Sequence, residues 1–229
     1  MRLDRFVANT TAESRQSIRR KISEGRVSVG GEVTRQFDVE IDQFVRIELD
    51  GRVLQEKVAY YFMLNKPVGY LSATSDPQYK VVLELFEETY RSELHLAGRL
   101  DRNTSGLMLL TNDGRWSRKI TEPGEKIPKT YLVKTEKPVT QEYVDLFAAG
   151  MYFPYEDVHI QPAQLEILDA HLSRLTIYEG RYHQVKRMYG RLRNKVVALH
   201  RERMGHIALD RELVAGDYRP LTAAEVASV

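Results

Sequence analysis

The sequence predicts an α+β protein with two domains, a small one over residues 1–58 and a larger one over residues 59–229. Two observations lead to this prediction. The first sixty residues contain two short helical patterns followed by short strands, and beyond a polar stretch strand-like and helix-like segments alternate. The chain of 229 residues, 42% hydrophobic and 29% charged, is also long enough for a small domain plus a medium one.

Two helices are expected to open the small domain. Their apolar residues recur three or four positions apart, at Leu3, Phe6 and Val7 in the first helix and at Ile18 and Ile22 in the second. Ser14 can cap the second helix, which runs over residues 15–24, and Gly25 ends it.

A small sheet is expected to follow. Residues 27–29 alternate as a strand into the Gly30-Gly31 turn, and residues 44–49 form a second strand before Asp50-Gly51. Residues 51–59 are polar and lack periodicity, so they are the expected linker.

The larger domain is predicted from alternating elements. Strands are expected over residues 60–64, 70–73, 106–111, 130–135, 164–168, 174–178 and 195–199. Helices are expected over residues 82–90, 114–121, 140–149 and 182–192, with a short last helix capped by Thr222.

Several function classes are excluded by what the sequence lacks. Without cysteine there is no disulfide, thiolate catalysis or Cys-ligated zinc, and the six histidines show no metal-binding spacing. The sequence has no G-x-G-x-x-G, Walker A or G-x-S-x-G motif, so neither a cofactor nor a metal is expected. No apolar run approaches a membrane span, and the charged first residues do not fit a signal peptide, so a cytoplasmic location is expected.

The charge is unevenly distributed although the formal net charge is only +2. Residues 181–203 contain eight Lys or Arg and a single acid, Glu202. A polyanion is a natural partner for such a stretch. The alternative is a solvated helix face.

Four stretches occur in the order found in one family: residues 64–69 (LNKPVG), residues 98–111 with GRLD, TSGL and Thr111, residues 129–131 (KTY), and residues 179–188 (EGRYHQVKRM). Together they resemble the motifs of the RsuA-type pseudouridine synthases, and residues 1 to about 51 are similar to the S4 RNA-binding domain that precedes their catalytic domain. The resemblance implies a catalytic domain built on a mixed, largely antiparallel sheet with flanking helices. It also implies site-specific isomerisation of one uridine in small-subunit (16S) ribosomal RNA, without a cofactor.

Asp101 is the expected catalytic carboxylate. The isomerisation breaks the bond from ribose C1′ to uracil N1 and joins C1′ to C5, and a carboxylate suffices to attack or stabilise the reacting carbon. Asp101 precedes the apolar strand at residues 107–110, in a loop from which a side chain can project. From the local sequence alone, a turn cap with Asn103 and Thr104 is the alternative.

Lys186 and Tyr131 complete the expected catalytic set. A cation is needed to keep an enclosed aspartate ionised, and the resemblance places Lys186 there, with Arg187 as the fallback and a solvated helix charge as the alternative. The resemblance also places Tyr131 against the uracil ring, where it can stack and accept the C5 proton. A packed core tyrosine is the alternative for Tyr131.

Four residues are expected to bind the substrate. Arg99 resembles the family residue that fills the gap left by a flipped nucleotide, although an internal salt bridge is the rival interpretation. Asn65 and Lys66 are expected at the pocket rim, unless their motif is structural, and Arg187 is the fourth.

The RNA-binding cations are expected to contact phosphates and so give salt-dependent affinity. They are Arg15, Arg19, Arg20, Lys21 and Arg26 in the first domain and Arg181, Arg191 and Arg193 in the second. His183, His200 and His206 are expected to be hydrogen-bonded structural residues, with RNA contact as the alternative.

Two other functions stay open at this stage. One is a non-catalytic S4-type RNA-binding or ribosome-assembly protein, and the other is a carboxylate hydrolase, which needs a second placed acid; only Glu179 stands out within the motifs. The expected partner is small-subunit ribosomal RNA, either naked or partly assembled with protein. The protein is expected to be monomeric and not bound to a membrane.

Overall fold

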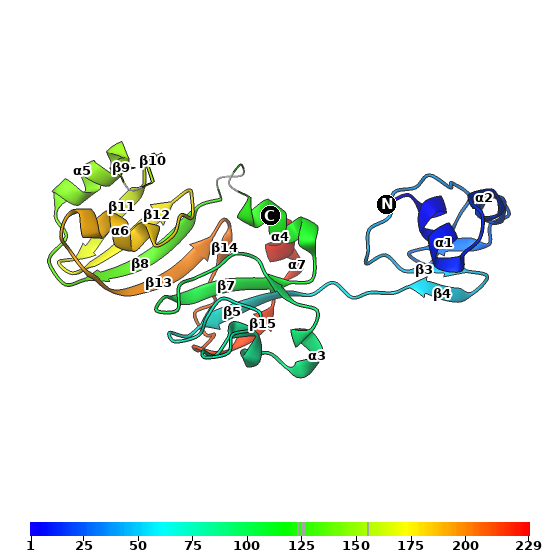
Figure 1. Ribbon diagram of the computed structural model, residues 1–229, viewed down its shortest axis with the longest axis horizontal. Coiled ribbons are helices and arrows are strands. Elements are labelled where there is room, and N and C mark those ends of the chain that lie inside the picture. The colour runs from blue at the N-terminus through cyan, green and yellow to red at the C-terminus, as the bar shows by residue number, and fades with distance from the viewer. Residues whose placement is uncertain (123, 125–126, 155) are drawn as a thin grey trace. The chain divides into compact units, whose positions relative to one another are not determined.

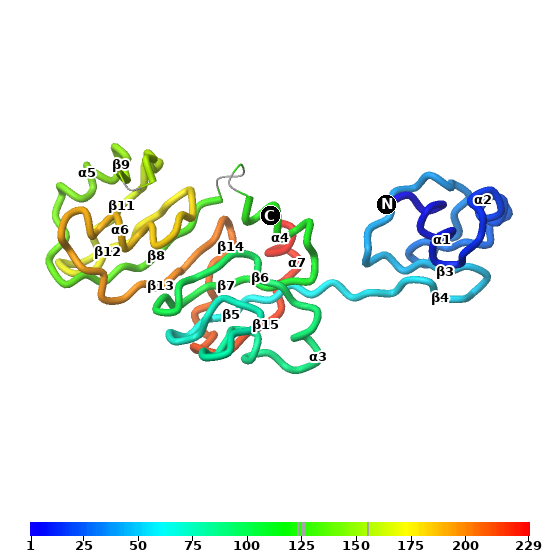
Figure 2. Tube along the Cα trace, in the orientation of Figure 1, coloured from blue at the N-terminus to red at the C-terminus, as the bar shows by residue number. Residues whose placement is uncertain are grey.

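The computed structural model of this protein describes residues 1–122, 124, 127–154 and 156–229. The chain divides into two compact units, Met1–Ala59 and Tyr60–Val229 (Figures 1 and 2). The sequence places the boundary between residues 58 and 59. Each unit has its own apolar core.

The first unit packs two helices against a four-stranded antiparallel sheet with the order β2-β1-β3-β4. The elements are α1 (Leu3–Thr11), α2 (Arg15–Ser23), β1 (Val27–Val29), β2 (Glu32–Thr34), β3 (Ile47–Leu49) and β4 (Arg52–Gln55). The Ser17 N–H donates to the Ser14 hydroxyl at 3.2 Å, and Gly25 has φ +76°, so the predicted start and end of the second helix are confirmed.

Two predictions in this unit are wrong. The strand expected from residue 44 begins only at Ile47, because the Asp42 carboxylate accepts the N–H groups of Phe44 and Val45 and holds them in a turn. The expected linker from residue 51 instead begins with β4, whose polar sequence is paired with β3.

The second unit is built on a nine-stranded mixed sheet. Seven strands follow the order β11-β12-β8-β13-β7-β5-β15, with β14 paired to β13 and β6 to β7. Their bounds are β5 (Tyr61–Lys66), β6 (His95–Leu96), β7 (Ser105–Thr111), β8 (Lys129–Thr135), β11 (Gln164–Asp169), β12 (Leu172–Ile177), β13 (Val196–Met204), β14 (Ile207–Ala208) and β15 (Tyr218–Pro220). Among the strand pairs that the structure describes in this sheet, only β13–β7 is parallel, so the expected mixed, largely antiparallel sheet is confirmed.

Helices and a separate hairpin flank this sheet (Figure 1). They are η1 (Val82–Leu85), α3 (Glu88–Arg91), α4 (Gly114–Thr121), α5 (Gln141–Ala149), α6 (Gln184–Arg191) and α7 (Ala223–Ala227), with the hairpin β9 (Met151–Phe153) and β10 (Val158–Ile160). The predicted helix over residues 82–90 is two short turns interrupted at Phe86, and the predicted strand over residues 70–73 is only a single bridge from Leu71 to Val81.

The apolar run in β7 is buried on both faces of the sheet. Leu107 and Leu109 pack with α4 on one side, while Met108 and Leu110 pack with the aromatic cluster around Phe62 on the other. A strand covered on both faces is expected to be apolar without alternation.

Strand β13 joins two parts of the sheet, the strands β11, β12 and β8 on one side and β7, β5 and β15 on the other, as the trace in Figure 2 shows. It pairs with β8 along its length and meets β7 only at His200 and Arg201. At that crossing Gly106 has φ +103°, and a Cβ there would lie 2.3 Å from the Arg201 carbonyl oxygen. Glycine is therefore required for the two strands to meet, and their meeting forms one wall of the site.

Candidate active site

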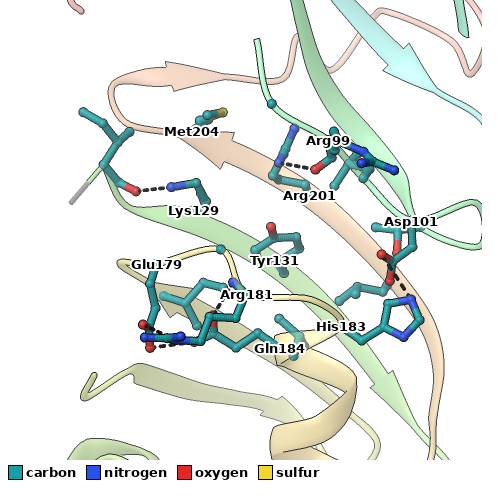
Figure 3. A pocket seen from close by; sticks show the side chains of 18 of the residues that line it. Arg99, Asp101, Lys129, Tyr131, Glu179, Arg181, His183, Gln184, Arg201 and Met204 are labelled. Atoms are coloured by element: carbon teal, nitrogen blue, oxygen red, sulfur yellow. Dashed lines mark hydrogen bonds and ion pairs between the residues drawn. The ribbon is translucent and has the colours of Figure 1, made fainter. Parts of the chain in front are cut away.

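A cavity of about 500 Å³ lies in the second unit (Figure 3). The loop at residues 98–104, strands β8 and β13 and the start of α6 contribute its walls. Asp101, Lys186, Tyr131 and Arg99, which the sequence selects independently of geometry, all line it. The structure therefore brings the central candidate residues to one place.

The Asp101 carboxylate is partly shielded and held by two basic groups. Its side chain is 27% exposed, its Oδ2 lies 2.8 Å from Lys186 Nζ, and its Oδ1 lies 3.4 Å from His183 Nε2. The Thr104 N–H donates to the backbone carbonyl of Asp101, at 3.0 Å. Because the turn uses that carbonyl, the carboxylate stays directed at the cavity and not at the turn cap that the local sequence suggested.

Lys66 stabilises the backbone of the loop that carries Asp101. Its side chain is fully buried, and its Nζ donates to the carbonyl oxygens of Pro67 and Thr104 at 3.0 and 2.9 Å and, at longer range, to those of Asp101 and Arg102 at 3.3 and 3.4 Å. Burial lowers the pKa of Lys66 to about 8, although the nearby Asp101 charge acts in the opposite direction.

Asn65 and Lys66 are not at the pocket rim. Neither is among the described residues that line the cavity. The Asn65 amide donates to the Leu213 carbonyl at 2.8 Å, which directs it toward a different loop. The structure thus favours the structural alternative for this motif over substrate contact.

The start of α6 places Lys186. Gln184 ties the preceding loop together, because its side chain accepts the Arg181 N–H at 3.0 Å and donates to Glu179 Oε1 at 3.1 Å. His183 adopts the left-handed conformation, with φ +51°, immediately before the helix. Lys186 then lies in the first turn, where it reaches Asp101, and the expected ion pair is present.

Arg187 points elsewhere. It pairs with Glu156, and its guanidinium carbon lies 4.0 Å from the centre of the Phe153 ring. It does not line the cavity within the described parts of the chain, so the structure does not support the expected role of Arg187 in substrate binding or as the fallback partner of Asp101.

Tyr131 is both a core residue and a cavity residue. Only 7% of it is exposed, and it packs in the apolar cluster that contains Leu100 and Leu199. It nevertheless lines the cavity, from the middle of β8. The two interpretations of Tyr131 are therefore compatible, because the core ends at the cavity wall.

Arg99 is exposed beside Asp101 and lines the cavity. Among the described residues its guanidinium forms no hydrogen bond or ion pair; only its backbone carbonyl is used, as an acceptor for Arg201 at 3.4 Å. The internal salt bridge considered as the rival interpretation is therefore not found in the described structure.

Most of the cations expected to bind RNA in the first unit have acidic partners. Arg19 pairs with the buried Asp4 at 2.8 Å, Lys21 with Glu13 at 2.6 Å and Arg26 with Asp50 at 2.7 Å. Arg20, 74% exposed, lies 3.7 Å from Glu24, and Arg15 is exposed. Arg15 and Arg20 are thus the most available of the five for a polyanion.

The cations expected to bind RNA in the second unit also differ in position and in whether they have an acidic partner. Arg181 lines the cavity and pairs with Glu179 at 3.0 Å, whereas Arg191 is exposed. Arg193 lines an open groove of about 750 Å³ that shares Lys186 and Leu199 with the cavity wall.

Three further basic residues of the cavity were not selected from the sequence. His183 was expected to be structural, Lys129 was quoted only as part of a motif, and Arg201 was counted only in the charged stretch. Lys129 and His183 lie in two of the motifs and Arg201 lies in the charged stretch, but only the fold shows that they share one cavity.

The described residues contain neither a cluster suited to a metal ion nor a helix suited to a membrane. Among residues 1–122, 124, 127–154 and 156–229, no group of three or more His, Asp or Glu side chains is arranged to hold a metal ion. Over those same ranges, no helix has the length and apolar character needed to cross a membrane.

Known proteins are similar to this chain over its whole length. Residues 60–190 match the family described as RNA pseudouridylate synthase. Proteins named ribosomal small subunit pseudouridine synthase A from Pseudomonas aeruginosa and Escherichia coli (strain K12) are 55% and 46% identical, each covering 100% of both chains. A solved structure described as that of a pseudouridylate synthase superposes with a TM-score of 0.73 at 41% identity, covering 100% of this chain and 99% of the other.

Proposed function

The chain belongs to the RNA pseudouridylate synthase family, and from this premise we propose that it isomerises one uridine of small-subunit ribosomal RNA to pseudouridine, with Asp101 as the catalytic carboxylate. The observation that supports this role most strongly is the Asp101 carboxylate, which faces a cavity large enough for a nucleotide base and is paired with Lys186 at 2.8 Å. The site therefore offers a charged carboxylate in a partly water-shielded place, which the chemistry requires.

The reaction needs no other reagent. The bond from C1′ to N1 breaks, the base turns within the cavity, C5 bonds to C1′, C5 loses its proton and N1 gains one. Substrate and product are isomers, so nothing is oxidised and no group is imported. Asp101 stabilises or attacks the electron-poor sugar carbon, and Lys186 stabilises the carboxylate charge.

The proposal also gives roles to Tyr131 and Arg99, and their positions at the cavity support these roles. Tyr131 offers its ring to the uracil from the cavity wall, which keeps the detached base in place while it turns. A uridine must leave its stack to reach Asp101, at a cost of a few kcal/mol. The Arg99 guanidinium is exposed beside the cavity and has no hydrogen bond or ion pair to any described residue, so it is suited to fill the vacated position and to contact phosphate.

The first unit serves as an S4-like RNA-binding domain in this proposal. Arg15 and Arg20 supply its phosphate contacts, because Arg15 is exposed and Arg20 is 74% exposed and 3.7 Å from Glu24. The other three expected cations, Arg19, Lys21 and Arg26, are held closer to acidic partners. We place the activity in the cytoplasm, where bacterial ribosomal RNA is assembled, and expect a monomer to suffice because the described cavity is formed by one chain.

The proposal is tested with small-subunit RNA transcript, alone and partly assembled with ribosomal proteins. Pseudouridine is mapped by carbodiimide-dependent primer stops, and RNA affinity is measured by filter binding. Wild type should give one stop, and Asp101→Asn none, with unchanged affinity; Asp145→Asn, on the exposed face of α5, is the matched control and should behave as wild type.

Three outcomes would contradict the proposal. The absence of a stop with wild type in either preparation would refute the activity and favour a protein that only binds RNA. Release of free uracil would favour a hydrolase. A full stop with Asp101→Asn would remove Asp101 from the chemistry.

A further inference from the structure

We propose that Lys129 and Arg201 form a cationic wall that stabilises the negative charge of the detached uracil base, an inference that rests on the proposed function and adds two residues to it. Lys129 is the residue that contacts the base, and Arg201 is a fixed charge behind it. Both line the cavity that contains Asp101.

Lys129 has free hydrogen-bonding capacity inside the cavity. It lies two residues before Tyr131 on β8, so both side chains point to the same face of the sheet. Its Nζ donates to the Ile127 carbonyl at 2.8 Å, and no other hydrogen bond or ion pair of this side chain occurs within the described ranges. An ammonium group has three donors, so two remain available to a ligand.

Arg201 is a buried charge that has no acidic partner among the described residues. It lies directly opposite Tyr131 on β13 and is 2% exposed. Its Nε donates to the Leu107 carbonyl at 2.8 Å and its Nη1 to that of Arg99 at 3.4 Å, whereas its buried Nη2 has no partner among the residues that the structure describes. A guanidinium stays charged, and burying one without a carboxylate is costly, so this arrangement requires an explanation beyond stability.

The charges around the cavity do not balance. The lining side chains include five cations and three carboxylates, namely Arg99, Lys129, Arg181, Lys186 and Arg201 against Asp101, Glu122 and Glu179. Two of the carboxylates have their own basic partners, and the third, Glu122, is exposed. Burial, and then the charge of Arg201, lower the pKa of Lys129, so its charged form is disfavoured in the cavity as described.

The reaction supplies a transient anion that fits this wall. When C1′–N1 breaks, the electron pair remains on N1 and spreads over the ring to O2 and O4. The base is neutral before this step and again once C5 has bonded to C1′, because the later loss of the C5 proton and gain of a proton at N1 leave its charge unchanged. Cations placed beside the ring therefore bind the base more tightly in its cleaved form than in the substrate, which accelerates the reaction.

The positions of the side chains match this assignment. In Figure 3 the Tyr131 ring lies between Asp101 and Lys129, and Arg201 lies next to the ring. A base stacked on Tyr131, with its sugar at Asp101, therefore presents its far edge to Lys129. The carboxylate and the cationic wall thus act on the two fragments of the same broken bond.

The test varies both the residue and the leaving group. Lys129→Met should slow single-turnover conversion of uridine by about 10- to 100-fold, with little change in RNA affinity, and Lys129→Arg should retain more activity because it keeps the charge. Lys134→Met is the matched control, since Lys134 is exposed on the opposite face of the same strand. The same variants are assayed on RNA with 5-fluorouridine at the target, by its disappearance from nuclease digests.

Fluorine withdraws electrons and stabilises the uracil anion, so the base needs less help to leave. The defect of Lys129→Met should therefore be several-fold smaller for 5-fluorouridine than for uridine. Equal defects on both substrates, or a loss of RNA affinity that accounts for the whole effect, would overturn the inference, as would wild-type activity of Lys129→Met. Should Lys129→Met unfold, Lys129→Gln repeats the comparison. If wild type converts neither substrate, the proposed function itself fails, so the two failures are distinguishable.

Discussion

The ion pair between Lys186 and Asp101 makes the sharpest prediction about turnover. Lys186→Met removes the cation but retains an unbranched side chain of similar length. The pair is 2.8 Å long and its side chains are 29% and 27% exposed, so it is a charge-assisted hydrogen bond in a partly shielded place. Such bonds contribute about 1.5–3 kcal/mol. If this stabilisation is needed in the transition state, kcat falls by roughly 10- to 150-fold.

RNA affinity should change much less, because the charge of Lys186 is used on Asp101 and not on a phosphate. Single-turnover rates at saturating enzyme report the chemical step, and filter binding at several salt concentrations reports affinity. Arg187→Met is the informative neighbour: Arg187 pairs with Glu156 outside the cavity, so its loss should leave turnover close to wild type.

Two results would refute this reasoning. A parallel loss of affinity and turnover in Lys186→Met would place Lys186 at the RNA backbone. A larger turnover defect in Arg187→Met than in Lys186→Met would mean that the two cations exchange roles when RNA binds.

Three further predictions follow from other parts of the structure. Lys66→Met leaves carbonyl oxygens of the Asp101 loop without their donor and should lower the free energy of unfolding by about 2–4 kcal/mol, and an unchanged urea midpoint would contradict this. Burial lowers the pKa of His95 and of His200, so the unfolded chain takes up protons before the folded protein does as the pH falls below 6.5, and stability is lost there. The double variant His95→Gln with His200→Gln should therefore lose less thermal stability between neutral and acidic pH than wild type. An equally large loss would exclude these histidines as its source. Arg15→Ala with Arg20→Ala should weaken RNA binding and flatten its salt dependence, and an unchanged slope would remove this surface from the RNA contact.

The parts of the fold that could be predicted have strong local signals. The helix capped by Ser14 has its apolar residues on one face, and β7 is a continuous apolar run covered on both sides. Strands of two or three residues, such as β6 and β14, have no periodicity of their own and exist only because a neighbour pairs with them. Tertiary context decides such elements.

Strand β13 shows most clearly where prediction of the fold from the sequence fails. It was predicted to end at residue 199, where the apolar pattern gives way to a polar, charged sequence, yet it continues to Met204. Pairing with β8 on one side and β7 on the other satisfies the backbone of these residues, and Gly106 makes the second contact possible. The charged sequence concealed a central strand because Arg201 is buried and its charge serves the cavity.

The sequence predicts the central residues of the candidate site, but it does not predict how the surrounding basic residues are used. The resemblance to the RsuA-type synthases, which rests on the order of the motifs, predicted Asp101, Tyr131 and Lys186 as one catalytic set. The basic stretch at residues 181–203, in contrast, suggested a uniform RNA-binding surface. In the structure Arg181 and Arg187 pair with glutamates within the protein, and no sum of charges along a sequence separates such residues from free ones.

The position of Asp101 is set by its backbone more than by its own side chain. Ser72 exchanges hydrogen bonds with Leu100 at 2.6 and 3.0 Å, Lys66 donates to several carbonyls of the loop, and Arg201 donates to the carbonyl of Arg99. These supports come from different segments and are buried, so the loop is held before any RNA arrives. A carboxylate fixed in this way does not have to be ordered at the moment of reaction, which lowers the entropic part of the barrier. It follows that substitutions behind the cavity, such as Ser72→Ala, should slow turnover without changing a single group that touches the substrate.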